Sequence, residues 1–263
     1  MLILGLTGSI ASGKSTASRI LSTTHSLPII DADVLARRVV EPGTTGFERI
    51  KDYFLPTTPD LLNADGSLNR AALGKRVFGD SEERRADRAV LNRIVHPAVR
   101  REMMKAIFWN WIKGHWAVVL DVPLLLEAGL DAVCGEVVLI DVSDEELQIG
   151  RILGRDKEIG GTMTREDARR RIQSQMPRKE KVGIMEEVWK KRNRGYIVEN
   201  DSGKEELEKR LAEVVDTLQA KRSKTWTWLM LLIPFLTLGT SIWVLATTWW
   251  TKRTYYRKKA KSA

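Results

Sequence analysis

Residues 2–16 read LILGLTGSIASGKST, a short apolar run followed by a turn rich in glycine and serine. The turn from Gly8 to Ser15 fills every fixed position of the pattern GxxxxGKS/T. The apolar residues before it are typical of a buried parallel strand. This order predicts a loop that wraps a phosphate with backbone N–H groups, followed by a helix whose N-terminus adds positive charge. We interpret the segment as a nucleoside-triphosphate site.

The side chains of this turn fit phosphoryl chemistry. Lys14 is expected to neutralise charge on the β- and γ-phosphates, and the Ser15 hydroxyl to ligate Mg²⁺. The expected cofactors are therefore ATP, as phosphoryl donor, and Mg²⁺. The residues expected to hold the nucleotide are Gly8, Ser9, Ile10, Ala11, Ser12, Gly13, Lys14, Ser15 and Thr16.

The positive charge of the chain lies at its C-terminal end. The formal net charge is +9, and the residues from Lys221 onward include nine Lys and Arg but no Asp or Glu. Residues 1–220 are therefore balanced, with 34 basic and 34 acidic residues. Since a nucleic-acid footprint would lie on the folded domain, we expect no nucleic-acid partner. The single cysteine, Cys134, excludes an intramolecular disulfide, which is typical of a reducing compartment.

An uncharged stretch from Thr225 to Thr251 contains five tryptophans. As a helix, 226–250 would extend about 37 Å at about 1.5 Å per residue, enough to cross a hydrocarbon core of about 30 Å. Aromatic residues mark both ends, with basic residues outside them. We expect a basic linker at 221–225, a transmembrane helix at 226–250 and a basic tail at 251–263. A buried or interfacial helix is the alternative.

The position of this stretch close to the C-terminus predicts a tail anchor inserted after synthesis. The catalytic domain would then lie in the cytosol. The composition favours the mitochondrial outer membrane, with the endoplasmic reticulum as the alternative.

Five short apolar segments predict the strands of an α/β fold. The first begins at Leu2, and the other four lie at 27–31, 116–123, 135–142 and 195–200. Helical segments separate them. Such a pattern favours a five-stranded parallel sheet with right-handed crossovers, in a three-layer arrangement. Ligands collect at the carboxyl ends of such strands.

Carboxylates are expected at these strand ends. Asp31 and Asp33 end the second strand, where one of them can accept the proton of an acceptor hydroxyl. Helix capping is the alternative role for either residue. Asp121 is expected to approach Mg²⁺, and Arg37, one turn after Asp33, to contact a substrate phosphate or to lie on the surface. His96 and Pro97 are expected to shape the start of a helix.

Arginines four residues apart mark a candidate lid. Arg151 and Arg155 share one helix face, from which they can close over the phosphates and neutralise charge on the transferred group.

Six segments in order carry a resemblance to a known family. They are GLTGSIASGKST at 5–16, DADVLAR at 31–37, IVHPAV at 94–99, VLDVPLLLEAGL at 119–130, QIGRILGR at 148–155 and RIQSQMP at 171–177. Together they resemble the dephospho-CoA kinase family of P-loop kinases, over most of residues 1–205. The segment RGYIVENDSG at 194–203 departs from the family pattern, which affects the adenine side of the site.

The resemblance implies a kinase domain over 1–220 that transfers the ATP γ-phosphoryl group to the 3′-hydroxyl of dephospho-CoA. It implies a general base at Asp33, with Lys14, Arg151 and Arg155 as further catalytic residues. It also implies a helical region at about 35–114 that embraces the CoA moiety, and a lid at about 148–180. Partners would be dephospho-CoA, ATP, the membrane and other CoA-pathway enzymes.

Two alternatives to this activity remain. One is a kinase for another hydroxyl acceptor such as a nucleoside. The other is an inactive scaffold for CoA-pathway enzymes, which would not need to keep Lys14, Ser15, Asp33, Arg151 and Arg155 together.

Overall fold

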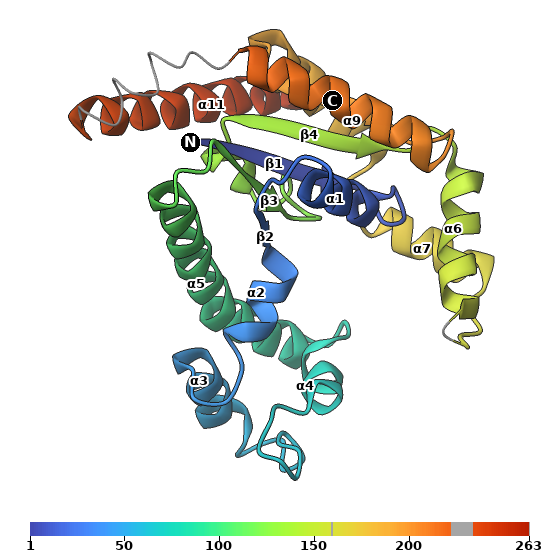
Figure 1. The fold of residues 1–263 in the computed structure, drawn as a ribbon. Coiled ribbons are helices and arrows are strands. Elements are labelled where there is room, and N and C mark those ends of the chain that lie inside the picture. The colour runs from blue at the N-terminus through green and yellow to red at the C-terminus, as the bar shows by residue number, and fades with distance from the viewer. Residues whose placement is uncertain (159, 222–233, 263) are drawn as a thin grey trace. The chain divides into compact units, whose positions relative to one another are not determined.

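The computed structural model of the chain describes residues 1–158, 160–221 and 234–262. The fold divides into two compact units. The first, the sheet unit, comprises Met1–Ile29 and Gly114–Ala263, and the second, the helical unit, comprises Ile30–Lys113. Figure 1 shows the elements along the chain.

The described residues form a five-stranded sheet with the strand order β2-β3-β1-β4-β5. Its strands are β1 (Leu2–Gly8), β2 (Ile29–Asp31), β3 (Ala117–Asp121), β4 (Glu136–Asp141) and β5 (Gly195–Glu199). β1 pairs in parallel with β3 and β4, and β4 pairs in parallel with β5. The predicted five-stranded parallel sheet is confirmed. Its strands are short and apolar because the central ones are covered on both faces.

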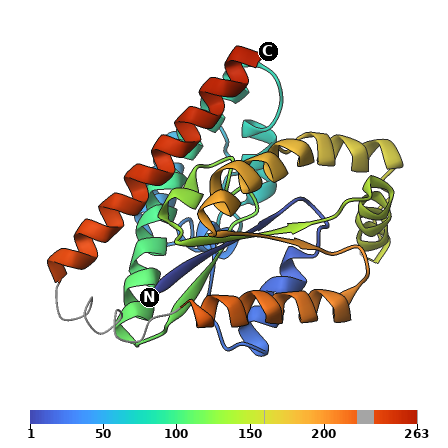
Figure 2. The same ribbon diagram turned by 90° about the horizontal axis from the view of Figure 1, so that it is seen from above.

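Helices cover both faces of this sheet. Those of the sheet unit are α1 (Lys14–Thr23), η1 (Leu130–Val133), α6 (Glu145–Glu158), α7 (Arg165–Gln173), α8 (Arg178–Ile184), η2 (Met185–Trp189), η3 (Lys190–Arg192), α9 (Lys204–Ala220) and α11 (Pro234–Ser262). α1 and α9 share one core with the sheet, in which Leu6, Leu21 and Leu211 are fully buried. η2 packs on the opposite face, against β4 and β5. Figure 2 shows α9, in orange, and the gold segment of α8 and η2 on opposite sides of the sheet.

The helical unit consists of α2 (Ala32–Arg38), α3 (Thr45–Phe54), α4 (Arg70–Val77) and α5 (Glu82–Ile112). Its core is centred on the fully buried Ile50, Phe54 and Leu61. The expectation that a helix starts at His96 and Pro97 is wrong, because Pro97 lies inside the 31-residue α5. α2, α3 and α4 all pack against α5, and this tertiary packing overrides the helix-breaking tendency of proline.

The expected transmembrane helix at 226–250 is not supported. Residues 226–233 of that range lie outside the described residues. Among the helices that the structure does describe, none has the length and apolar character needed to span a bilayer. α11 carries hydroxyl residues throughout its uncharged part, and charged residues begin at Lys252.

Candidate active site

The glycine-rich loop between β1 and α1 is shaped to receive an anion. Gly13 adopts the left-handed conformation, with φ of 93°, and precedes α1 without a side-chain cap. The first turn of α1 contains no acidic residue. The N-terminal amides of a helix have no partner within the helix, so this end is a ready anion site. The Ser12 amide donates to the Ser9 carbonyl at 3.1 Å, which closes the loop.

Side chains from three distant segments fix the loop. The Ile10 amide donates to Gln175 Oε1 at 3.0 Å, and Gln148 Nε2 donates to the Ile10 carbonyl at 2.5 Å. On the other side, the buried Asn200 donates through Nδ2 to the Ser12 carbonyl at 2.8 Å. The loop is therefore held through the carbonyl oxygens of Ile10 and Ser12 and through the Ile10 amide.

Only glycine fits at position 13. A Cβ there would lie 2.1 Å from Asn200 Nδ2, and the positive φ is itself unfavourable for a residue with a side chain. The glycine is thus required both by the backbone conformation and by the close approach of Asn200.

Lys14 and Asp121 form an ion pair in the sheet unit. Asp121 ends β3 and is almost fully buried, while Ser15 is exposed on the first turn of α1. The structure therefore brings together Lys14 and the carboxylate expected near Mg²⁺. No group of three or more His, Cys, Asp or Glu in the described ranges is arranged to hold a metal ion.

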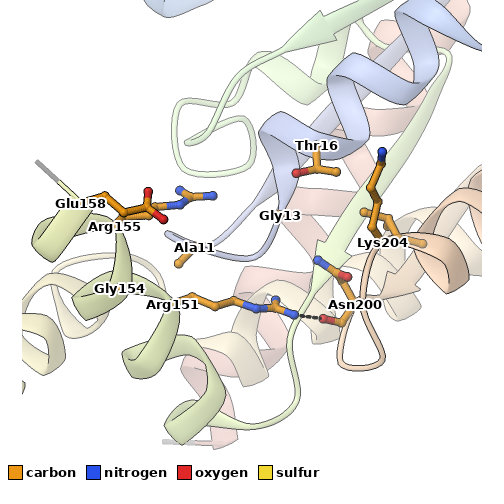
Figure 3. Close-up of a pocket in the computed structure, with 11 residues that line it drawn as sticks. Ala11, Gly13, Thr16, Arg151, Gly154, Arg155, Glu158, Asn200 and Lys204 are labelled. Carbon is orange, nitrogen blue, oxygen red and sulfur yellow. Dashed lines mark hydrogen bonds between the residues drawn. The ribbon is translucent and has the colours of Figure 1, made fainter.

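A cleft of about 370 Å³ opens beside the loop (Figure 3). Its lining comprises Ala11, Gly13, Thr16, Arg151, Gly154, Arg155, Glu158, Asn200, Gly203, Lys204 and Leu207. Figure 3 shows Arg151 and Arg155 extending from α6 toward the loop. Arg151 Nη2 donates to the Asn200 carbonyl at 2.8 Å, and its buried Nη1 has no hydrogen-bond partner among the described residues. A buried guanidinium donor without a partner favours an anionic or carbonyl-bearing ligand in this cleft.

A second ion pair lies at the end of β4. Asp141 accepts hydrogen bonds from Arg178 Nε and Nη2, at 2.5 to 3.0 Å, and these bonds raise the pKa of Arg178 above its ordinary value. Nearby, the buried Lys181 pairs with Glu127 at 3.0 Å and lies 3.5 Å from Ser9 Oγ. These pairs link the segment after α7 to the sheet and to the glycine-rich loop.

The helical unit holds the other predicted residues. Asp31 is the N-cap of α2, and its Oδ1 accepts from the amides of Asp33 and Val34 at 2.8 and 3.0 Å. Asp33 is exposed on the first turn of that helix. Arg37 is exposed on the last turn, where its carbonyl accepts from Arg70 Nη2 at 3.4 Å. Of the two carboxylates, Asp31 therefore caps α2.

Sequence reasoning missed the side chains that hold the loop and complete the cleft, namely Gln148, Gln175, Asn200 and Lys204. One signal was available for Asn200, which directly follows an apolar strand at its carboxyl end. The glutamines had no such signal, because they meet Ile10 only through the folding of α6 and α7.

Comparisons with known proteins agree with this geometry. A family model described as CoaE, dephospho-CoA kinase, matches residues 2–199. The chain belongs to the dephospho-CoA kinase family. Dephospho-CoA kinase CAB5 of Saccharomyces cerevisiae is 42% identical over 225 residues, which cover 86% of each chain. Dephospho-CoA kinase of Halalkalibacterium halodurans is 39% identical over 218 residues, which cover 83% of this chain and 96% of the relative.

Solved structures share the fold of this family member. TT1252 from Thermus thermophilus superposes with a TM-score of 0.63 at 27% identity, covering 84% of this chain and 98% of that structure. Dephospho-CoA kinase from Campylobacter jejuni superposes with a TM-score of 0.53 at 23% identity, covering 82% and 96%. The P-loop kinase fold inferred from the sequence is confirmed.

Proposed function

We propose that the chain transfers the γ-phosphoryl group of ATP to the 3′-hydroxyl of dephospho-CoA. The observation that carries this proposal is the match to the dephospho-CoA kinase family over residues 2–199, which includes the intact phosphate loop. The loop geometry at Gly13 and the unpartnered Arg151 donor support a nucleotide in the cleft.

On the donor side, residues 8–16 would bind the ATP phosphates, with backbone amides of the loop as donors. Lys14 would exchange Asp121 for phosphate oxygens, and Arg151 and Arg155 would neutralise charge on the transferred group from α6. Ser15 and Asp121 are oxygen donors of the kind Mg²⁺ prefers, alongside phosphate oxygens. When bound, the ion would shield the negative charge of the phosphates. The segment at 148–180 would act as the lid.

On the acceptor side, we assign the general base to Asp33. Its carboxylate is exposed, whereas the carboxylate of Asp31 is engaged in capping α2. The helical unit would hold the CoA moiety, which is consistent with its own cavity of about 330 Å³ bordered by Arg38 and Arg101. Arg37 would contact a phosphate of the acceptor.

The test offers the full-length protein ATP with dephospho-CoA, adenosine, uridine or shikimate, and follows ADP release. We expect ADP release with dephospho-CoA, and loss of that activity in Lys14→Ala. Preference for another acceptor would replace the assignment with a different small-molecule kinase. If no acceptor were phosphorylated, or if Lys14→Ala left phosphorylation unchanged, the proposed role of the loop would be wrong and a scaffold would be favoured.

The location of the protein is part of this proposal. The tryptophan-rich C-terminal segment and its nine flanking basic residues support attachment to a membrane, with the kinase domain in the cytosol. The mitochondrial outer membrane is the favoured site and the endoplasmic reticulum the alternative, where other CoA-pathway enzymes would be partners. Fluorescence microscopy of the full-length chain with organelle markers tests this localisation.

A further inference from the structure

α11 has its polar and apolar faces reversed relative to a helix that packs on a soluble domain. A surface helix ordinarily turns its apolar face to the protein and its polar face to water. In α11, the residues facing the rest of the sheet unit follow a helical spacing and are mostly polar: Val244, Thr247, Thr248, Thr251, Lys252 and Tyr255. Among them, Thr248 is fully buried.

Polar contacts hold this face against the rest of the sheet unit. Arg192 Nη2 donates to the Thr247 carbonyl and to Thr251 Oγ1, and Arg192 Nη1 lies 3.5 Å from Thr248 Oγ1. Lys252 Nζ lies 2.5 Å from Oδ1 of the fully buried Asp131.

Asp131 is also held from the protein side, where Trp189 Nε1 donates to its Oδ2 at 3.2 Å. Burial raises the pKa of Asp131, and Lys252 opposes that rise. The lysine therefore helps to keep the buried carboxylate ionised. Hydrogen bonds and an ion pair, rather than the burial of apolar surface, therefore hold α11 in this position.

The opposite face of α11 presents large apolar side chains to the surroundings. Trp243 is 70% exposed, Trp250 61%, Ile242 58% and Trp249 56%. One turn later the same face carries Arg253, whose guanidinium lies 4.9 Å from the Trp249 ring centre, and the exposed Arg257. Tryptophan beside arginine is the composition of a helix that lies at a membrane surface.

Charge indicates what covers this face. From Lys221 to the C-terminus the chain has nine basic residues and no acidic one, whereas residues 1–220 are electrically balanced. Basic residues next to an apolar helix face are attracted to anionic lipid headgroups.

We propose that α11 lies flat on an anionic lipid bilayer, with its tryptophan face in the headgroup region and its threonine face docked on the kinase domain. This inference rests on the membrane attachment proposed above and specifies its mode. The ion pair between Asp131 and Lys252 would fix the orientation of the sheet unit toward the membrane.

The first experiment measures co-sedimentation of full-length protein with vesicles of phosphatidylcholine, with or without phosphatidylserine. We expect binding to the phosphatidylserine vesicles, reduced about tenfold or more in Trp249→Ala/Trp250→Ala. The matched control is Trp109→Ala/Trp111→Ala, which removes two exposed tryptophans from α5 and should leave binding unchanged. Equal binding to both vesicle types, or loss of binding only in the control, would overturn the proposal.

The second experiment distinguishes lying from spanning. Ser262→Cys places a thiol near the C-terminus, and the native Cys134 is buried. Protein is first bound to the outside of intact vesicles and then treated with a membrane-impermeant maleimide. We expect this thiol to be labelled to the same extent as in a sample without vesicles. Protection of the thiol until detergent is added would show a spanning helix and overturn the proposal. Kinase activity measured on the same samples reports separately on the proposed function.

Discussion

Gly13 joins the two requirements of the phosphate loop, a left-handed backbone and a close neighbour. Gly13→Ala would cost about 1–3 kcal/mol for the left-handed conformation, in addition to the clash with Asn200. The loop must shift to relieve this clash, and a displacement of about 1 Å can reduce turnover about a hundredfold. We expect kcat/KM for ATP to fall by about that factor in steady-state assays.

The control for this substitution is Gly66→Ala. Gly66 also has a positive φ, of 78°, but no atom of the described residues lies within 4 Å of the Cβ position. It should lower the thermal unfolding temperature with little change in kcat/KM. Equal kinetic losses in the two variants would mean that general destabilisation, and not the loop, is responsible.

Asp31 and Asp33 differ in the role that each can play. Asp31 caps α2, and asparagine is about as good an N-cap as aspartate, so Asp31→Asn should leave both stability and turnover close to wild type. Asp33→Asn removes the proposed base and should lower kcat by about 10²–10⁴-fold, with less effect on KM. Assays of ADP release at saturating substrates check this difference, and similar losses of turnover in both variants would contradict the assignment.

Among the elements, α6 contributes Arg151 and Arg155 to the cleft beside the glycine-rich loop. Arg151 extends from this helix to the Asn200 carbonyl, and its Nη1 has no hydrogen-bond partner in the part of the chain that the structure describes. Arg151→Gln removes charge-assisted hydrogen bonds worth about 1.5–3 kcal/mol, or about ten- to a hundredfold in kcat/KM for ATP. Arg170→Gln is the control, because that side chain is exposed on α7 and pairs only with Asp167 among the described residues. A loss as large in the control would assign the effect to surface charge.

The strands were predictable as elements but not in their order. Each is a short apolar run, because buried strands leave little room for polar residues. β1 begins at Leu2 as expected, and β3, β4 and β5 lie within two residues of the expected ranges at both ends. The placement of β1 between β3 and β4 depends on crossovers and long-range packing, which leave no local pattern. For the same reason Gln148 and Gln175 gave no sign of their contact with Ile10. α5 runs through Pro97 because three neighbouring helices stabilise it, which the dipeptide alone does not reveal.

For the molecule as a whole, the glycine-rich loop could be located from sequence, whereas the reversed faces of α11 could not. The sequence shows that 226–250 is uncharged and rich in tryptophan. Which residues of α11 meet the rest of the sheet unit depends on Asp131 and Arg192, two residues far from this helix along the chain.

The single cysteine provides a test of how well the sheet unit excludes solvent. Cys134 is fully buried, and burial raises the pKa of its thiol far above the ordinary value. The thiolate is the reactive form of cysteine. An exposed thiol should react with a soluble disulfide reagent about tenfold faster at pH 8 than at pH 7. Cys134 in the native protein should not react at either pH. Denaturant should release one reactive thiol. Rapid native labelling would show that this core opens readily.

The central position of β1 also has a consequence for biogenesis. Leu4 pairs with Val119 and with Glu136, so the whole helical unit is synthesised before this strand gains either neighbour. Contacts so distant along the chain close slowly, and until they close they leave strand edges unpaired and apolar side chains exposed. Nascent chains that have not reached β4 also lack Arg151 and Asn200, which line the cleft, so nucleotide cannot stabilise them through this cleft at that stage.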